Sequence, residues 1–183
     1  VIGMMEYSGV KIQVIENPAI NSEYYDRGLT NSADVVLILV TDINQIEEIE
    51  KKLDKTKGKR IIVFNLKNNN DYRKIFATLQ SKRYNFIIIS TKTRENLDAL
   101  KEKIFHGFGK IRVYTKEPGK EKSTKPMILE PETSVKEIAE KILKNLNWLK
   151  ETKIWGPSSK FPGQIVGLNH KLKDMDVIEF RTK

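Results

Sequence analysis

The sequence predicts an α/β protein in which a mostly parallel sheet with flanking helices is followed by a smaller, strand-rich module. Two observations support this prediction. Through residues 1–108, short apolar runs alternate with stretches whose apolar residues recur at helical spacing, a pattern typical of βαβ units. After Gly107-Phe108-Gly109 the order changes to a hairpin, one helix and more strands, as in a ubiquitin-like β-grasp. We therefore expect two domains, residues 1–108 and residues 109–183.

The first region begins with a predicted hairpin. Met4–Tyr7 and Val10–Glu16 are β-like runs on either side of Ser8-Gly9, a pair that suits a tight turn. Asp34–Val40 contains a continuous apolar run, which predicts a strand buried on both faces. With the hairpin added, the expected sheet is mixed and has one antiparallel edge strand. The two further strands expected here are Arg60–Phe64 and Asn85–Ile89.

Helical segments separate these strands. Ile43, Ile46, Ile49 and Leu53 recur at helical spacing, and similar patterns follow each of the next two strands. We interpret these apolar positions as core. Tyr24–Leu29 is expected to form a short helix or an ordered loop. The later helix positions are Tyr72, Ile75, Phe76 and Leu79, then Leu97, Leu100 and Ile104.

The second region contains a clear helix start. Ser134 and Glu137 have the spacing of an N-terminal capping box, in which the serine accepts a bond from a first-turn N–H. Apolar residues at helical spacing follow from Val135 to Leu146. The strands expected around this helix are Lys110–Thr115, Pro126–Leu129, Lys153–Trp155, Gln164–Val166 and Val177–Thr182.

Composition limits the chemistry of the chain. Its 183 residues contain no cysteine and two histidines, which excludes disulfides, thiolate metal sites and a cysteine nucleophile. No apolar run approaches the roughly 20 residues that span a bilayer, so we expect a cytoplasmic protein without a membrane partner. The formal charge is +9, of which +3 falls in residues 1–108 and +6 in residues 109–183. This excess favours a polyanionic partner, RNA first, with solubility alone as the alternative.

Basic and aromatic residues occur together in the second region. Trp155 and Phe161 would stack on exposed bases while lysines contact phosphates. The alternative is that both aromatic residues belong to a small core and the basic residues form a solvated rim. The candidate RNA-binding residues are Lys110, Arg112, Lys116, Lys120, Lys122, Lys125 and Lys160.

Polar side chains follow two neighbouring strands of the predicted sheet. Asn65 and Asn68 come after Arg60–Phe64, and Ser90-Thr91-Lys92 follows Asn85–Ile89. The carboxyl ends of parallel strands form the edge at which open α/β sheets bind ligands. We therefore expect a base or a phosphate to be recognised by these side chains.

Several blocks of the sequence carry a resemblance to a known family. Residues 3–13 (Gly-Met-Met-Glu-Tyr-Ser-Gly-Val-Lys-Ile-Gln), with Pro18 and Ile20, resemble the hairpin that follows switch I in DRG-type GTPases. These are the developmentally regulated GTP-binding group of the Obg-related family. Residues 111–116 (Ile-Arg-Val-Tyr-Thr-Lys), 155–160 (Trp-Gly-Pro-Ser-Ser-Lys) and 166–179 are similar to the TGS domain that ends those proteins. The resemblance implies the C-terminal part of a Ras-like G domain followed by a β-grasp TGS domain.

The resemblance also implies GTP or GDP and Mg²⁺ as ligands. Glu16-Asn17-Pro18-Ala19 stands where the family has Asp-x-x-Gly, which places Glu16 near Mg²⁺ and the Ala19 amide near the γ-phosphate. Asn65-Leu66-Lys67-Asn68 stands for Asn-Lys-x-Asp, so Asn68 replaces the carboxylate that selects guanine. Ser90-Thr91-Lys92 stands for Ser-Ala-Lys, in which the Thr91 N–H meets the base and the Lys92 stem covers it.

The phosphate loop Gly-x-x-x-x-Gly-Lys-Ser/Thr and the switch I threonine do not occur in these residues. The chain alone is therefore not expected to hydrolyse GTP, and in a longer gene product the loop would lie upstream of Val1. Two functions stay open. One is a translation- or ribosome-associated GTP-binding protein whose TGS domain binds RNA. The other is a degenerate, non-hydrolysing scaffold whose TGS domain binds RNA or protein, a regulatory protein partner included.

Overall fold

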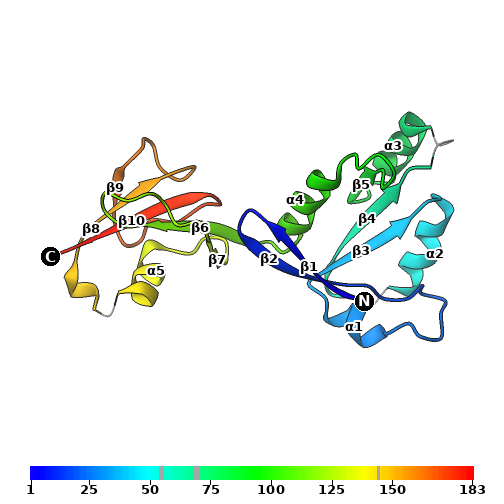
Figure 1. Ribbon diagram of the computed structural model, residues 1–183, viewed down its shortest axis with the longest axis horizontal. Coiled ribbons are helices and arrows are strands. Elements are labelled where there is room, and N and C mark those ends of the chain that lie inside the picture. Colours follow the sequence, from blue (N-terminus) through cyan, green and yellow to red (C-terminus); the bar gives the residue numbers. More distant parts are fainter. Residues whose placement is uncertain (54–55, 68–70, 144) are drawn as a thin grey trace. The chain divides into compact units, whose positions relative to one another are not determined.

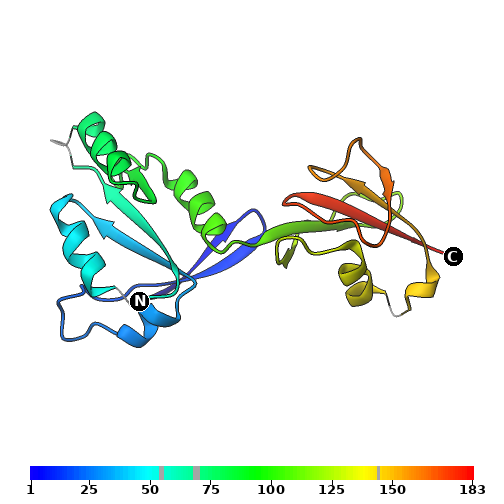
Figure 2. The ribbon, with the colours of Figure 1, turned by 180° about the vertical axis from the view of Figure 1, so that it is seen from behind.

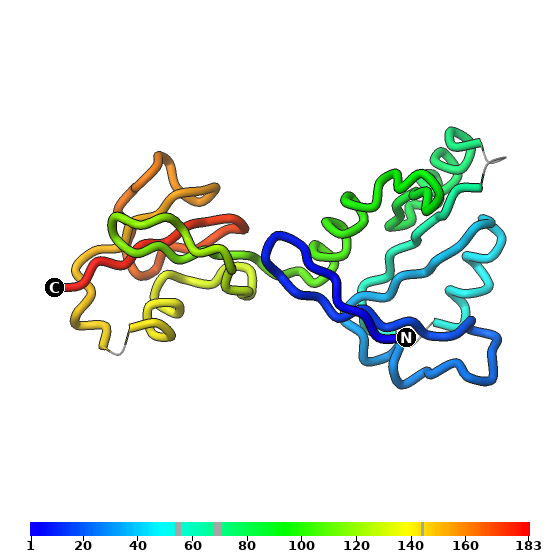
Figure 3. The backbone as a smooth tube through the Cα atoms, in the orientation of Figure 1, coloured from blue at the N-terminus to red at the C-terminus, as the bar shows by residue number. Residues whose placement is uncertain are grey.

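The computed structural model describes residues 1–53, 56–67, 71–143 and 145–183 of the chain. The contacts within it divide the chain into two compact units (Figure 1). The first consists of Val1–Tyr7 with Ile12–Phe108, and the second of Ser8–Lys11 with Gly109–Lys183. The path of the chain through each unit can be followed in Figure 3. Each unit has a buried apolar core of its own.

The first unit is built on a three-stranded parallel sheet. Its strand order is β3-β4-β5, and Ile38 of β3 pairs with Ile62 of β4. The hairpin β1–β2 forms a separate two-stranded sheet. The elements are β1 (Ile2–Tyr7), β2 (Val10–Ile15), α1 (Arg27–Ser32), β3 (Val35–Val40), α2 (Asn44–Lys52), β4 (Lys59–Asn65), α3 (Tyr72–Ser81), β5 (Phe86–Ile89) and α4 (Leu97–Gly107).

Two sequence predictions differ from this structure. The mixed sheet is wrong, because the hairpin β1–β2 forms no ladder with β3, β4 or β5 within the described ranges. The short helix expected within Tyr24–Leu29 begins only at Arg27, because the Asp26 carboxylate accepts the Leu29 N–H at 3.0 Å and caps the helix there.

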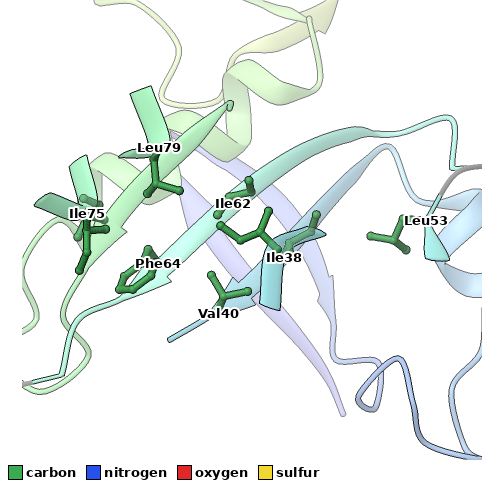
Figure 4. Packing of buried hydrophobic residues seen from close by; sticks show 9 residues of the cluster. Ile38, Val40, Leu53, Ile62, Phe64, Ile75 and Leu79 are labelled. Carbon is green, nitrogen blue, oxygen red and sulfur yellow. The ribbon is translucent and has the colours of Figure 1, made fainter. Parts of the chain in front are cut away.

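The main core of the first unit lies on one face of the parallel sheet. Alternate residues of β3 and β4 point to this face and meet apolar residues of α2 and α3 (Figure 4). Phe64 and Leu79 are almost completely buried there. The buried members of this cluster are Ile38, Val40, Ile46, Leu53, Ile62, Phe64, Ile75, Leu79 and Ile88.

The opposite face of the same sheet is only partly covered. Leu97 and Leu100 of α4 pack there against residues of β4 and β5, and α4 lies across the sheet from α2 (Figure 2). Leu37 and Leu39 of β3 belong to this face, because they alternate with buried residues of the core face. Their exposed fractions are 36% and 64%. The prediction that this strand is buried on both faces is therefore wrong.

The second unit is a five-stranded sheet with one helix packed on it. The strand order is β7-β6-β10-β8-β9, in which β6 and β10 are parallel and the other pairs are antiparallel. The predicted cap is present, since Ser134 Oγ accepts the Glu137 N–H at 3.4 Å. The elements are β6 (Ile111–Lys116), β7 (Met127–Leu129), α5 (Val135–Ile142), η1 (Leu146–Trp148), β8 (Leu149–Trp155), β9 (Gln164–Val166) and β10 (Asp176–Thr182). Together, the parallel sheet with flanking helices and this β-grasp confirm the predicted fold class.

Candidate functional site

Asn65 and Thr91 meet at the carboxyl ends of β4 and β5. Asn65 is the last residue of β4, and its ladder partner on β5 is Ile89. The Asn65 side-chain nitrogen donates to Thr91 Oγ1 at 3.1 Å, and Asn65 Oδ1 accepts the Thr91 N–H at 3.1 Å. One side chain thus ties together the segments that follow two neighbouring strands. This is the arrangement that the sequence predicted for these two residues.

The segment after β5 is shaped by its own hydrogen bonds. Ser90 is buried, and its Oγ accepts the Thr93 N–H at 3.2 Å. The Asn96 side chain donates to the Ile88 carbonyl at 2.9 Å. Arg94 and Asn96 both have a positive φ, at 62° and 59°. Lys92 is exposed on this segment, where its stem can cover a planar ligand.

Two positions of the base-recognition motif differ from what the resemblance implies. The Thr91 N–H, assigned to the base, is already bonded to Asn65. Leu66, which stands at the motif's lysine, packs against the main core. Asn68 lies outside the described residues, so its predicted contact with guanine stays a prediction. The edge therefore has the hydrogen-bonded pair Asn65–Thr91, but it carries a leucine at the position where the motif has a lysine.

Asn17, and neither Glu16 nor Ala19, makes the side-chain hydrogen bonds of the segment that corresponds to Asp-x-x-Gly. Glu16 and Ala19 are exposed, and no hydrogen bond or ion pair of the described chain joins them to Asn65 or Thr91. Asn17 instead donates to the Asp26 carbonyl and to Thr30 Oγ1, both at 2.8 Å, and accepts the Asp26 N–H at 3.0 Å. The sequence offered one signal for this role, since an asparagine before a proline suits a turn.

Potential metal ligands are scattered among the described residues. No group of three or more His, Cys, Asp or Glu side chains is placed to hold a metal ion in these ranges. Glu16 supplies one carboxylate near the predicted switch, and Mg²⁺ at nucleotide sites is held by one or two carboxylates together with substrate phosphates. No helix in the same ranges is long and apolar enough to cross a membrane.

Arg112, predicted to bind RNA, is a structural residue. Its side chain is 6% exposed, and its Nε and Nη2 donate to the two carboxylate oxygens of Asp174 at 3.0 and 2.5 Å. The Asp174 carboxylate also accepts the Arg112 backbone N–H at 2.7 Å. The prediction is wrong because a fork-shaped ion pair formed across 62 residues of sequence takes the guanidinium out of solvent.

The other candidate RNA-binding residues fall into three groups. Lys110 and Lys120 form ion pairs, with Glu130 and Glu117 respectively. Lys116 and Lys122 lie over aromatic rings, at 4.6 Å from the Trp155 centroid and 4.5 Å from the Tyr114 centroid, and Lys116 also pairs with Glu179. Lys125 and Lys160 are exposed, and no ion pair is recorded for either in the described part of the chain.

These lysine–aromatic pairs lie on the sheet face opposite α5. Tyr114 and Trp155 are both cross-strand neighbours of Val177, so the two rings flank one position of β10. Trp155 is half-buried, between the two alternatives that the sequence left open, and Phe161 in the following loop is 59% exposed. Tyr114, in contrast, is buried at 6% exposure. The face therefore presents cations beside one partly accessible ring, that of Trp155.

A charged network that the sequence did not reveal borders this face. Glu179 is 2% exposed and is surrounded by Lys116 at 3.7 Å and Arg181 at 2.8 Å. The hydrogen bond from Arg181 to Glu179 raises the pKa of the guanidinium above its ordinary value. Glu151 also pairs with Arg181, at 3.3 Å. The sequence did not reveal this network because charged residues of both signs occur along β8 and β10, and their order does not show which of them form ion pairs.

Hydrogen bonds from three side chains hold the loop after β8. Ser158 Oγ and His170 Nε2 are 2.9 Å apart, and Asp176 accepts the Ser158 N–H at 3.0 Å and the Lys173 N–H at 2.7 Å. Asp176 is completely buried. His170 and Asp176 therefore hold the turns that precede the last strand.

Comparison with known proteins identifies the class of the second unit. Residues 111–182 match the TGS domain. The chain is 32% identical over 158 residues to an uncharacterized GTP-binding protein of Methanocaldococcus jannaschii, covering 81% of this chain and 39% of that protein. It is 40% identical over 100 residues to developmentally-regulated GTP-binding protein 1 of Xenopus laevis, covering 52% and 27%. With human developmentally-regulated GTP-binding protein 2 the identity is 31% over 105 residues, covering 56% and 29%.

A parallel α/β unit followed by a TGS domain defines the class: a TGS-domain protein. More particularly, the chain belongs to the DRG-type GTP-binding proteins and corresponds to their C-terminal region with its TGS domain. The match spans about two fifths of the archaeal relative and under a third of the animal ones.

Proposed function

We propose that the carboxyl ends of β4 and β5 hold the base of a guanine nucleotide, as one part of a DRG-type nucleotide site. The observation that carries this proposal is the clamp between Asn65 and Thr91, which joins two strand ends at the edge where parallel sheets bind ligands. The relatives named above are GTP-binding proteins, which supports guanine as the base.

The chemistry of this edge limits what it does. A guanine carbonyl oxygen that reaches the Thr91 N–H must share or displace its bond to Asn65. An asparagine at position 68 offers one acceptor and one donor where guanine presents two donors, so selectivity over adenine is reduced. No phosphate loop occurs in the sequence, and we assign no hydrolysis step to this chain.

Titration by NMR tests the base site. GDP added at millimolar concentration to the labelled chain is expected to shift the Asn65 and Thr91 resonances, and Asn65→Ala is expected to abolish the shifts. Asn85→Ala is the matched control, since Asn85 is an exposed asparagine that donates to the Arg60 carbonyl before β5. Shifts elsewhere, or none up to 10 mM GDP (a free energy of about 3 kcal/mol), would leave the scaffold function as the better account.

We further propose that the TGS sheet face bearing Lys116, Lys122, Tyr114 and Trp155 binds single-stranded RNA. The specific support is the position of two lysine cations over aromatic rings, which suits bases that stack and phosphates that need a positive charge. In a DRG-type protein such a face would contact ribosomal RNA or transfer RNA. Because these RNAs act in translation, we place the protein in the cytoplasm.

Salt-dependent binding tests the RNA proposal. The variant Lys122→Ala/Lys125→Ala/Lys160→Ala is expected to weaken binding of a short unstructured RNA and to reduce the slope of log K against log salt. The matched control replaces Lys51, Lys101 and Lys136, three lysines of helices α2, α4 and α5, by alanine. Equal loss in both variants, or affinity that does not change with salt, would contradict the proposal.

A further inference from the structure

A hollow lined by aromatic rings lies beside β5, the strand at one edge of the parallel sheet. Its volume is about 260 Å³, and residues of α3 and α4 contribute to its walls. The rings of Tyr72 and Phe76 stack with their centroids 6.0 Å apart, and Phe76 meets Phe86 edge to face at 5.5 Å. The residues that form this aromatic hollow include Tyr72, Phe76, Phe86, Ile88, Asn96 and Ala99.

Two of these rings are partly in water although their helix already has a buried face. Ile75 and Leu79 of α3 are buried in the main core against the sheet. Tyr72 and Phe76, which lie one helical turn apart, nevertheless have exposed fractions of 45% and 39%. Exposed apolar groups that lie next to one another mark binding surfaces, whereas single ones are ordinary. The second apolar face of α3 therefore indicates a place where another molecule binds.

The backbone of β5 is poorly suited to pair with an added strand. The strand has four residues, and no strand of the described chain pairs with its outer side. The Ile89 carbonyl accepts the Leu66 N–H on the β4 side, so the Ile88 carbonyl points outward. The Asn96 side chain already donates to that Ile88 carbonyl at 2.9 Å. A short edge that is capped in this way offers little backbone to a new strand, so we expect a side chain to enter the hollow.

The size and polarity of the hollow limit what enters it. Pockets for cofactors and drug-sized ligands measure roughly 300–1,000 Å³. A volume of about 260 Å³ is better suited to one large side chain. Among the described residues that line the hollow, only Tyr72 and Asn96 carry polar side-chain atoms, which is few for reading a nucleobase. Aromatic rings pack on other rings in offset or edge-to-face geometry, so an aromatic side chain of another protein fits these walls best.

The charge beside the hollow favours an acidic partner. Between Tyr72 and Tyr84 the chain carries four basic residues and no acidic one. Lys82 forms an ion pair with Glu47. The other three basic residues are exposed, and no ion pair is recorded for them within the described ranges: Arg73, Lys74 and Arg83. Cations without a carboxylate partner attract acidic groups, so we expect acidic residues on either side of the inserted ring.

We propose that the aromatic hollow binds an aromatic side chain from an acidic segment of a partner protein. The partner's ring packs against Phe76 and Phe86 and lies over Ala99, whose small side chain leaves room for it. Carboxylates on either side of that ring pair with the basic residues of α3 and of the turn that follows it. This surface uses none of the residues assigned above to the nucleotide base or to RNA.

Selection of binding peptides tests this proposal. Random peptides displayed on phage are selected on the full 183-residue chain in the absence of RNA and nucleotide. We expect the enriched peptides to contain a tryptophan, tyrosine or phenylalanine flanked by aspartate or glutamate. A synthetic copy of such a peptide should shift the NMR resonances of Phe86 and Ala99 in the labelled chain. Its affinity should fall as the salt concentration rises, because part of the attraction is between exposed charges.

Filling the hollow should prevent the peptide from binding. Ala99→Trp places a ring where the partner's ring would lie, and Ala99 is exposed, so the variant should stay folded by circular dichroism. We expect its affinity for the peptide to be at least tenfold weaker. Ala77→Trp is the matched control, because Ala77 is also an exposed helical alanine but does not line the hollow. It should bind within twofold of the unchanged chain.

Reversing the charge beside the hollow gives a second measure. Arg73→Glu/Arg83→Glu should weaken the peptide at least fivefold at low salt. Lys150→Glu/Lys173→Glu, which changes two exposed lysines of the TGS unit, should not.

The proposal is overturned if no peptide is enriched, if the enriched peptides lack aromatic or acidic residues, or if they bind Ala99→Trp as they bind the unchanged chain. It is also overturned if an unstructured RNA shifts the Phe86 and Ala99 resonances in place of the peptide. A dimer of the chain alone with Ala99 in its interface would overturn it too, since the occupant would then be a second copy.

Discussion

The two sheets of this protein end in very different edges. In the TGS sheet the edge strands β7 and β9 have three residues each, and each is followed within a few residues by a turn or loop. In the parallel sheet the edge strand β3 has six residues, all apolar. Short edges offer little backbone for pairing with another chain, whereas a long apolar edge offers a great deal. The contrast teaches that, within the described residues, the TGS sheet offers little free backbone at its edges, whereas the parallel sheet offers a long apolar strand.

The largest expected effect separates the two faces of the parallel sheet. Phe64→Ala removes a ring that is 1% exposed in the main core, and we expect a loss of about 3–5 kcal/mol in the stability of the first unit. Leu39→Ala changes a side chain that is mostly in water, and we expect less than about 0.5 kcal/mol.

Hydrogen exchange in β4 measures both losses without interference from the second unit. Tryptophan fluorescence does not serve here, because both tryptophans, Trp148 and Trp155, lie in the TGS unit. A loss for Leu39→Ala close to that for Phe64→Ala would show that β3 is covered on both faces and would remove the contrast between the two sheets.

The next effect concerns the ion pair that closes the TGS unit. Asp174→Asn leaves the buried Arg112 guanidinium without its carboxylate, and we expect a loss of about 3 kcal/mol. Glu130→Gln, which breaks the exposed pair with Lys110, is the control and should change stability by less than about 1 kcal/mol. Urea unfolding followed by tryptophan fluorescence measures both. Equal effects would mean that Arg112 is solvated and would restore it as a candidate RNA contact.

A smaller effect is expected at the nucleotide-base edge. Asn65→Ala removes both bonds to Thr91, and we expect the segment after β5 to lose about 1 kcal/mol of local stability. The Thr91 amide should then exchange about fivefold faster, while amides in the middle of β4 keep their rates. Unchanged exchange at Thr91 would show that the segment after β5 is held by Ser90 and Asn96 alone.

The smallest effect is a pH dependence on the surface of the first unit. The hydrogen bond from Lys82, at 2.5 Å, lowers the pKa of Glu47 below its ordinary value of 4.5. The carboxylate therefore stabilises the folded unit above about pH 4.5, and this stabilisation is lost as the pH falls through the lowered pKa. Glu47→Gln should flatten the fall in the stability of the first unit below pH 4.5, as measured by acid titration of hydrogen exchange. A steeper fall in the variant would reverse the sign of this contribution.

Local chemistry made much of the fold predictable. The hairpin around Ser8-Gly9, the capping box at Ser134 and the strands β4 and β5 follow from turn residues, caps and periodicity, all of which act within a few positions. The exposure of Leu39 could not be predicted. An apolar run indicates that burying the strand is favourable, but it does not show whether a neighbouring element buries it. The same run would be read identically in a completed sheet.

For the candidate site, too, the sequence predicted the contacts that follow from topology but not those between residues distant in the sequence. The meeting of Asn65 with Thr91 follows from parallel topology, which places consecutive strand ends side by side. The burial of Arg112 could not be predicted, because its partner Asp174 is 62 positions away in the sequence. The lysines near Arg112 in the sequence also suggested an exposed, basic surface. Asn17 was likewise passed over, since its bonds to Asp26 and Thr30 depend on how a loop folds back.

The packing of Leu66 has a consequence for any attempt to restore the lost cation of the base-recognition motif. The side chain lies against the main core, so Leu66→Lys would bring an ammonium group to a place that now holds hydrocarbon. The methylene stem of the lysine would have to fill the same space while its charge escaped to solvent. Re-engineering guanine recognition in this chain is therefore a problem of repacking a hydrophobic interior before it is a problem of ligand chemistry.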